Sequence, residues 1–101
     1  PVVLVFLAHP ARSSTKYGKR GAELYCIQDA TIACAHAQLA VTAVGLGSCW
    51  VGAFKPNAVR AAVKARSTLV PVALLPLGHS AERPPATGRR SLSKLVHKET
   101  L

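Results

Sequence analysis

Hydrophobic residues in this chain form long runs that are separated by polar or glycine-rich segments. The first run, Val2–Ala8, is continuously apolar and rich in β-branched residues, which is typical of a strand buried on both faces. The last run, Thr68–Leu77, predicts another strand. Pro71 and Pro76 lack a backbone N–H, so we expect each of them at a sheet edge or a strand end.

A long helix is expected between these runs, because Ala22–Val44 contains neither proline nor glycine and its apolar residues recur on two helical faces. Such a helix is apolar nearly all round, which predicts a central, buried position. Gly45 is expected to end it as a C-terminal cap. Within the helix, we expect His36 to be a hydrogen-bonded core residue and Asp29 to take part in a polar pair.

The remaining segments predict shorter elements. We expect a short strand over Ser48–Ala53 and a helix over Pro56–Ala65, with proline suited to the first helical turn. Proline, glycine and serine predict loops over His9–Gly21 and Gly78–Arg90. The terminal arm, Ser91–Glu99, has no obvious place in so small a core, so we expect it to pack on a partner subunit.

Length and composition indicate a single globular domain that spans residues 1–101, since half of the residues are hydrophobic and only 17% are charged. The chain has no methionine, and its first proline leads straight into an apolar run. We therefore expect upstream sequence to be missing. No segment has the length of a membrane span without a charge or turn signal, so the expected compartment is the cytoplasm and no membrane partner is expected.

The formal net charge of +9 favours anionic partners. Nucleic-acid binding is one interpretation, and a solvated basic surface is the other. Aromatic residues make up only 5% of the chain, which offers no stacking platform for single strands. We therefore favour the solvated surface. The basic residues fall into clusters: Arg12, Lys16, Lys19 and Arg20; Lys55, Arg60, Lys64 and Arg66; Arg83, Arg89, Arg90, Lys94 and Lys98.

Side chains that could perform catalysis do not form a recognisable constellation. The cysteines Cys26, Cys34 and Cys49 lack the spacing of a metal site, so we expect buried, reduced thiols and no bound metal. Ser48 and Cys49 are the best-placed nucleophiles, yet their surroundings do not match the Gly-x-Ser-x-Gly elbow of hydrolases. We assign no catalytic side chain. The sequence instead suits a protein in which a bound cofactor carries the chemistry.

Glycine is concentrated in Gly45–Phe54, Gly-Leu-Gly-Ser-Cys-Trp-Val-Gly-Ala-Phe, which also holds the only tryptophan. Glycines at this density allow a flat ligand or another backbone to approach the main chain closely. The alternative is a buried strand that is entered through a tight turn. Spacing alone does not decide between the two.

Several motifs follow one another along the chain: Tyr25-Cys-Ile-Gln-Asp29-Ala, the segment Gly45–Phe54, Pro71-Val-Ala-Leu-Leu-Pro-Leu-Gly78, Pro84-Pro-x-x-x-Arg89-Arg-x-Leu92 and Leu95-Val-His97. Taken in this order, they closely resemble the C-terminal part of the nitroreductase-like flavin proteins. That resemblance implies an α+β fold in which a mixed, mainly antiparallel sheet is wrapped by helices, with a central buried helix and a truncated N-terminus. It also implies an intertwined homodimer with FMN at the subunit interface and a C-terminal arm exchanged with the partner.

The resemblance places the cofactor on two segments. Val51, Gly52 and Ala53 match the segment that lies against the flavin ring, where a backbone N–H can reach flavin N5. Arg89 matches an arginine that binds the FMN phosphate, and Arg90 could serve in its place. The implied activity transfers a hydride from NADH or NADPH through the flavin to a small acceptor such as a nitroaromatic compound or a quinone.

The chain departs from the family pattern at several positions. Family members begin with an Arg-x-Ser-x-Arg-like motif for the FMN phosphate, and Arg12-Ser-Ser lies in the wrong place to replace it. Thr87 stands where some members carry a lysine. Trp50 is expected near the ring or, more readily, in the core. A flavin-free, truncated remnant that acts as a dimeric or partner-binding module is therefore the alternative.

Overall fold

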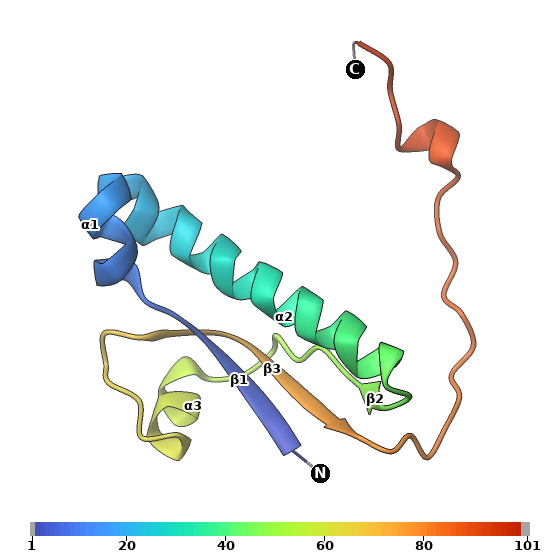
Figure 1. The fold of residues 1–101 in the computed structure, drawn as a ribbon, viewed down its shortest axis with the longest axis horizontal. Coiled ribbons are helices and arrows are strands. Elements are labelled where there is room, and N and C mark those ends of the chain that lie inside the picture. The colour runs from blue at the N-terminus through green and yellow to red at the C-terminus, as the bar shows by residue number, and fades with distance from the viewer. Residues whose placement is uncertain (1, 100–101) are drawn as a thin grey trace.

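A three-stranded antiparallel sheet in the order β1-β3-β2 forms the centre of the computed structural model, which describes residues 2–99 (Figure 1). Strand β1 (Val2–Ala8) pairs with β3 (Val70–Gly78) along its whole length. Strand β2 (Gly47–Ser48) adds a short pairing on the other side of β3. The expected α+β fold with an antiparallel sheet is confirmed.

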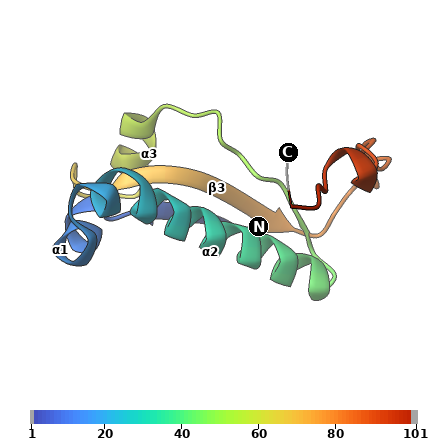
Figure 2. The ribbon, with the colours of Figure 1, turned by 90° about the horizontal axis from the view of Figure 1, so that it is seen from above.

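One long helical segment covers a face of this sheet. The π-helical turn η1 (Gly21–Tyr25) runs directly into α2 (Cys26–Ala43), which packs on β1 and β3 (Figures 1 and 2). Small side chains allow the close approach, since Cys34 of α2 is buried against Ala73 and Leu75 of β3. Gly45 has φ of +78° just beyond the helix end, which confirms it as the C-terminal cap.

The outer face of α2 is open in this chain, so the prediction of a helix buried all round is wrong for the described residues. Ile32, Leu39 and Val44 are exposed because the sheet covers only one side of the helix. His36 is also exposed rather than a core residue. Asp29 is exposed, and its carboxylate has no ion pair or hydrogen bond within residues 2–99, which contradicts the expected polar pair.

The segment predicted as a loop before the long helix is itself helical. Helix α1 (Pro10–Arg20) begins with proline in its first turn, and the Nδ1 atom of His9 accepts a hydrogen bond from the Arg12 N–H at 3.2 Å. Gly18 interrupts the helix with φ of +57°. The sequence predicted a loop here because polar residues and glycine are frequent in this segment. The hydrogen bond that caps the helix depends on three-dimensional geometry, so the composition did not reveal it.

Strand β1 lies at the sheet edge and is not buried on both faces, contrary to the sequence-based expectation. Val2, Val3 and Leu4 are exposed, and burial is complete only at Ala8. The apolar run was correctly read as a strand. Its position in the sheet depends on pairing partners, which a single strand sequence does not specify.

The two prolines of β3 lie in the central strand, although a sheet edge or strand end was expected. Pro71 coincides with a register shift in the β1–β3 ladder. Leu74 exchanges two hydrogen bonds with Val51, so Pro76, two residues later, faces the same side. The pairing there is sparse, and the Pro76 carbonyl accepts one bond from the Cys49 N–H at 3.3 Å. The missing N–H groups therefore fall where the ladder is incomplete.

A short helix, α3 (Pro56–Ala62), lies on the side of β3 opposite to α2 (Figure 2). It ends earlier than the predicted Pro56–Ala65. The Arg60 guanidinium donates to the Leu69 carbonyl at 3.2 Å, which ties the helix to the entry of β3. The strand expected over Ser48–Ala53 is reduced to β2 and a single bridge at Val51.

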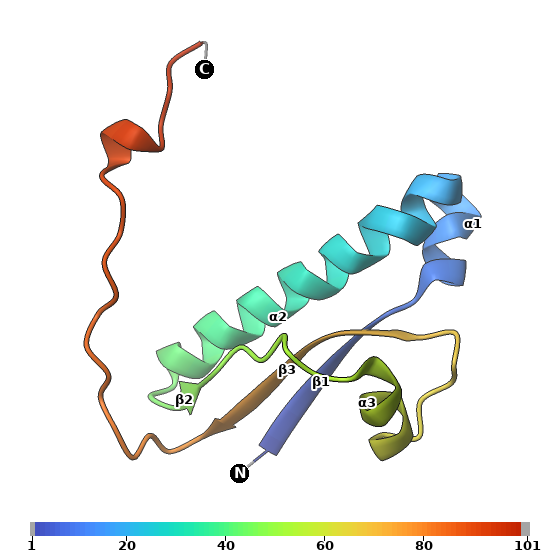
Figure 3. The ribbon, with the colours of Figure 1, turned by 180° about the vertical axis from the view of Figure 1, so that it is seen from behind.

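The predicted loop and the terminal arm form one continuous segment, residues 79–99, which is the C-terminal arm of the structure. This arm is exposed throughout and contains only a 3₁₀ turn, η2 (Leu92–Lys94). Figures 1 and 3 show it running away from the helix and sheet. The predicted loop and arm are confirmed, whereas packing on a partner subunit stays a prediction. Among the described residues, no helix is both long and apolar enough to cross a membrane.

Candidate functional site

The extended segment between β2 and α3 exposes main-chain amides beside the sheet. Val51 is anchored, because its N–H donates to the Leu74 carbonyl at 2.9 Å and its carbonyl accepts from the Leu74 N–H at 3.0 Å. Gly52 and Ala53 then leave the sheet and are exposed. Within residues 2–99, neither of their N–H groups has a hydrogen-bond acceptor. Two adjacent donors are thus free next to a fixed residue.

Gly52 has open space above its backbone. A Cβ atom placed there would meet only the Nε1 atom of Trp50, at 3.8 Å, which is an ordinary contact distance. Trp50 is 37% exposed, so the expected core position is wrong. The adjoining strand is too short to bury so large a side chain, and the indole lies beside Gly52 instead. A flat group could therefore approach this main chain.

The arginines of the arm have a different environment. Both Arg89 and Arg90 are exposed. The Nη1 atom of Arg89 donates to the Thr87 carbonyl at 3.2 Å, to the Gly88 carbonyl at 3.1 Å and to the Thr87 hydroxyl. All of these acceptors are immediate neighbours in the sequence. The guanidinium is consequently held by its own loop rather than by the body of the protein.

The chain does not bring these two groups of residues together. Figures 1 and 3 show the segment that carries Gly52 lying along the sheet, while the arm that carries Arg89 departs beyond the end of β3. Val51, Gly52 and Ala53 therefore form one part of the candidate site, and Arg89 and Arg90 form another. A single ligand could touch both only after the arm moves or a second chain contributes.

The three cysteines divide into two classes. Cys26 and Cys34 are buried, as expected, while Cys49 is exposed and contradicts that expectation. The Cys26 thiol donates to the Ala22 carbonyl at 3.1 Å. Burial raises the pKa of the Cys34 thiol above its usual value. No group of three or more metal-ligating side chains occurs among residues 2–99.

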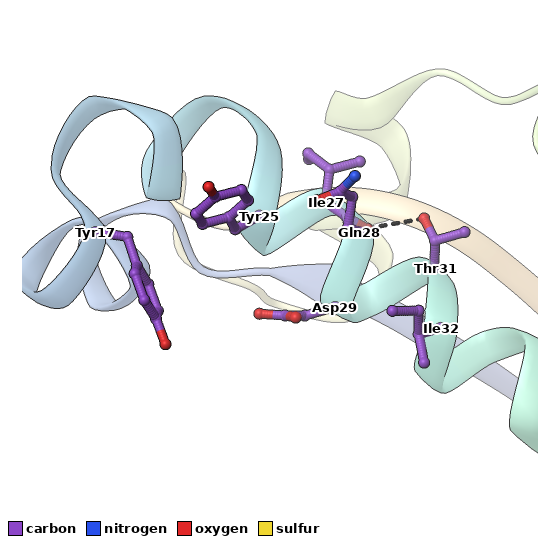
Figure 4. Close-up of a pocket in the computed structure, with 7 residues that line it drawn as sticks. All are labelled: Tyr17, Tyr25, Ile27, Gln28, Asp29, Thr31 and Ile32. Carbon is purple, nitrogen blue, oxygen red and sulfur yellow. Dashed lines mark hydrogen bonds between the residues drawn. The ribbon is translucent and has the colours of Figure 1, made fainter. Parts of the chain in front are cut away.

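An open hollow of about 650 Å³ lies where η1 joins α2, and the sequence did not indicate it (Figure 4). Tyr17 and Tyr25 line it with ring centroids 5.4 Å apart and planes at 83°. Lys16 lies 5.3 Å from the Tyr17 ring, and Arg20 donates to the Tyr25 hydroxyl at 3.1 Å. The exposed Asp29 also borders this hollow. Clustering of the only two tyrosines with basic residues was the available sequence signal.

An α+β domain of the nitroreductase type is the class that this sheet, its covering helix and the open main-chain segment define. A sequence model described as the nitroreductase family matches residues 1–79. The chain therefore belongs to the nitroreductase family. The matched region contains Val51, Gly52 and Ala53 and ends before Arg89 and Arg90.

Individual relatives agree with this assignment. A curated protein of Methanocaldococcus jannaschii that is named as a nitroreductase is 33% identical over 82 residues, which cover 81% of this chain and 40% of that protein. A nitroreductase family protein from Clostridium novyi NT has a TM-score of 0.67 at 34% identity, covering 78% of this chain and 42% of the other. The chain thus spans less than half the length of either relative.

A third comparison concerns the fold alone. The structure of an FMN-dependent nitroreductase from Clostridium difficile R20291 has a TM-score of 0.79 at 23% identity. It covers 100% of this chain, and this chain covers 58% of it. The similarity in fold therefore extends over the arm of this chain as well as over its helices and sheet.

Proposed function

We propose that this chain is part of an FMN-dependent NAD(P)H oxidoreductase of the nitroreductase type. Family membership and the likeness to a protein named as FMN-dependent support this proposal. When bound, FMN supplies the redox chemistry by accepting a hydride from NADH or NADPH and passing electrons to a nitroaromatic or quinone-like acceptor. The protein then needs to bind, orient and polarise the flavin, and no catalytic side chain is required.

The free amides of Gly52 and Ala53 are the observation that carries the proposal. The Val51–Leu74 hydrogen bonds fix the position from which these amides project. Donors held in place in this way stabilise negative charge on a bound ring without having to reorient. Val51 contributes contact and anchoring, because its own N–H is already used in the ladder. This refines the expected role of the three residues.

Arg89 and Arg90 would bind the FMN phosphate. A planar guanidinium suits a phosphate, and the bonds that now hold Arg89 are local and exposed, so exchanging them for a phosphate costs little. The proposal includes a homodimer. In this dimer, the arm of one chain and the ring segment (Val51, Gly52 and Ala53) of its partner would form one site. Free, unpaired cysteines suit a reducing compartment, and the proposal therefore includes the cytoplasm.

Binding of FMN and of riboflavin, measured by equilibrium dialysis, tests the ring segment and the arm separately, because riboflavin lacks the phosphate. We expect Gly52→Val to weaken both ligands by at least about tenfold, since branched carbons would hold the ring away from the amides. Ala62→Val is the matched control: it also adds bulk at an exposed position, on α3, and should bind as the parent chain does. Equal binding by Gly52→Val and the parent would contradict the proposal.

A flavin-free remnant that acts as a dimeric or partner-binding module stays a second candidate, because the segment that carries Gly52 and the arm that carries Arg89 lie apart in this chain. It predicts a colourless chain that forms a dimer yet binds neither FMN nor riboflavin at millimolar concentration. Dialysis and sedimentation on the same preparation separate this outcome from the first proposal.

A further inference from the structure

The hollow at the junction of η1 and α2 has walls that this chain fixes by its own packing. Gly21 is buried, and a Cβ atom placed there would lie 2.6 Å from the Ser13 carbonyl oxygen and 2.8 Å from the Tyr17 Cβ atom. Glycine at this position therefore allows α1 to fold back closely on η1. The close packing places Tyr17 edge-to-face against Tyr25, with ring centroids 5.4 Å apart. Contacts within the described residues thus hold both rings.

A free carboxylate lies in this hollow beside aromatic and aliphatic side chains. Asp29 is the charged residue among those that line the hollow, and its carboxylate has no hydrogen bond or ion pair within residues 2–99. Figure 4 shows this carboxylate pointing toward Tyr17, with Ile32 about one helical turn further along α2. The Thr31 hydroxyl is already used, because it donates to the Ile27 carbonyl at 2.8 Å. Asp29 is therefore a charged acceptor that a ligand could use.

Positive charge borders the same hollow. The Lys16 ammonium lies 5.3 Å from the centre of the Tyr17 ring. Arg20 donates through Nε to the Tyr25 hydroxyl, and its two terminal nitrogens have no hydrogen-bond partner in the described part of the chain. Residues 10–29 together carry four cations and two carboxylates. An excess of cations beside an aromatic hollow favours a ligand that carries an anionic group.

We propose that this hollow binds an adenine nucleotide. The base lies against Tyr17 and Ile32. Its amino group donates to the Asp29 carboxylate, and its phosphate binds Lys16 and Arg20. The volume of about 650 Å³ is within the usual range of small-molecule sites. The inference goes beyond the flavin proposal and does not depend on a bound flavin.

Two other kinds of ligand fit the hollow less well. An organic cation is attracted by a carboxylate and by tyrosine rings, but Lys16 and Arg20 already lie against these rings and repel a further cation. A planar anion without an amino group leaves the Asp29 carboxylate without a donor and is repelled by it. A ligand with a donor on its ring and an anionic group at its other end satisfies both sets of charges.

Equilibrium dialysis of this chain without flavin tests the proposal with AMP, adenosine and purine riboside 5′-phosphate. Adenosine lacks the phosphate, and purine riboside 5′-phosphate lacks the amino group. We expect AMP to bind at least about tenfold more tightly than either of the other two, because each of them loses a charge-assisted hydrogen bond. No binding of AMP at millimolar concentration, or equal binding of all three compounds, would overturn the proposal.

Substitutions at exposed positions assign the two ends of the ligand. Asp29→Ala should bind AMP no more tightly than purine riboside 5′-phosphate. Lys16→Ala should weaken AMP by about tenfold and leave adenosine unchanged. Lys55→Ala, which removes an exposed cation next to α3, is the matched control and should bind all three compounds as the parent does. Circular dichroism checks that each variant is folded.

The proposal is wrong if Asp29→Ala keeps the preference for AMP, or if Lys55→Ala weakens AMP as much as Lys16→Ala does. Competition with NADH distinguishes two sources of the same chemistry, because NADH contains an adenosine phosphate. Displacement of AMP by NADH would assign the hollow to the adenosine half of a dinucleotide. Retention of AMP, with the preferences above, would assign it to a mononucleotide, and both results agree with the proposal.

Discussion

The two parts of the candidate flavin site differ in how the chain holds them. Val51 is fixed to β3 by a pair of backbone hydrogen bonds, and Gly52 and Ala53 follow directly with free amides. Arg89 lies on an exposed arm and bonds only to Thr87 and Gly88, its own neighbours. The segment proposed to bind the ring is therefore part of the folded body, whereas the arginines proposed to bind the phosphate are not.

This difference parallels the match to the family. The region matched by the family model, residues 1–79, contains the sheet, its helices and the ring segment, and it excludes the arm. A rigid segment can be preorganised for a ligand within one chain. An arm that is exposed along its whole described length gains a fixed geometry only through a ligand or another chain. We therefore expect substitutions in the two regions to have separable effects on stability and on binding.

The largest expected effect is on the stability of the body. Leu75→Ala should lower the free energy of unfolding by about 2–5 kcal/mol, because Leu75 is completely buried and the change leaves a cavity. Leu92→Ala in the arm should change it by less than about 0.5 kcal/mol. Urea unfolding of both variants checks the contrast. Similar destabilisation by the two changes would show that the arm is packed after all.

A smaller effect is expected on phosphate recognition. Arg89→Ala should weaken FMN binding by about tenfold and leave riboflavin binding unchanged, since only FMN carries the phosphate. Arg89→Lys should restore part of the affinity, because a lysine keeps the charge and loses the planar fork. Arg83→Ala, earlier in the arm, is the control for general charge. An equal loss for both ligands would place Arg89 at the ring instead.

Alkaline pH should weaken the body through Cys34. Its folded-state pKa is raised above 9.0 by burial, so the thiol ionises first in the unfolded chain. This contribution to stability is complete below pH 9.0 and is lost as the pH rises toward the folded-state pKa. Across this pH range, the urea midpoint of the parent should fall more steeply with pH than the urea midpoint of Cys34→Ala. Parallel curves would argue against the assignment.

The smallest expected effect on stability comes from Cys49. This exposed thiol should react first with a disulfide reagent such as DTNB, without unfolding, whereas the buried Cys26 and Cys34 react only as the chain opens. Labelling at Cys49 should leave the urea midpoint unchanged. Three thiols that react at one rate would show that the body opens readily.

Hydrophobic patterning predicted the main strands and the long helix, because local periodicity determines these elements. It did not predict that α1 is a helix, since the bond between His9 and Arg12 is invisible in a composition rich in serine, glycine and lysine. It also placed Pro71 and Pro76 at a sheet edge or a strand end. The order of strands decides that question, and a single sequence gives no information on which strand lies at the centre.

The candidate site was predicted in part. A glycine-rich segment indicated a close approach of a ligand, and the structure shows open main chain at Gly52. The sequence could not show that the Val51 amide is already used or that Trp50 lies outside the core. It also could not show that Arg89 bonds to its own loop. Each of these depends on contacts between segments rather than on residue type.

The central claim concerns three consecutive amides, and their ¹⁵N–¹H NMR signals test it directly. On titration with FMN, the account predicts that the signals of Gly52 and Ala53 shift downfield in a saturable manner, because their free N–H groups bind the flavin. The Val51 signal should move least, since its N–H stays bonded to Leu74. If Gly52 and Ala53 stay in place at saturating FMN, or only arm residues shift, the account is contradicted.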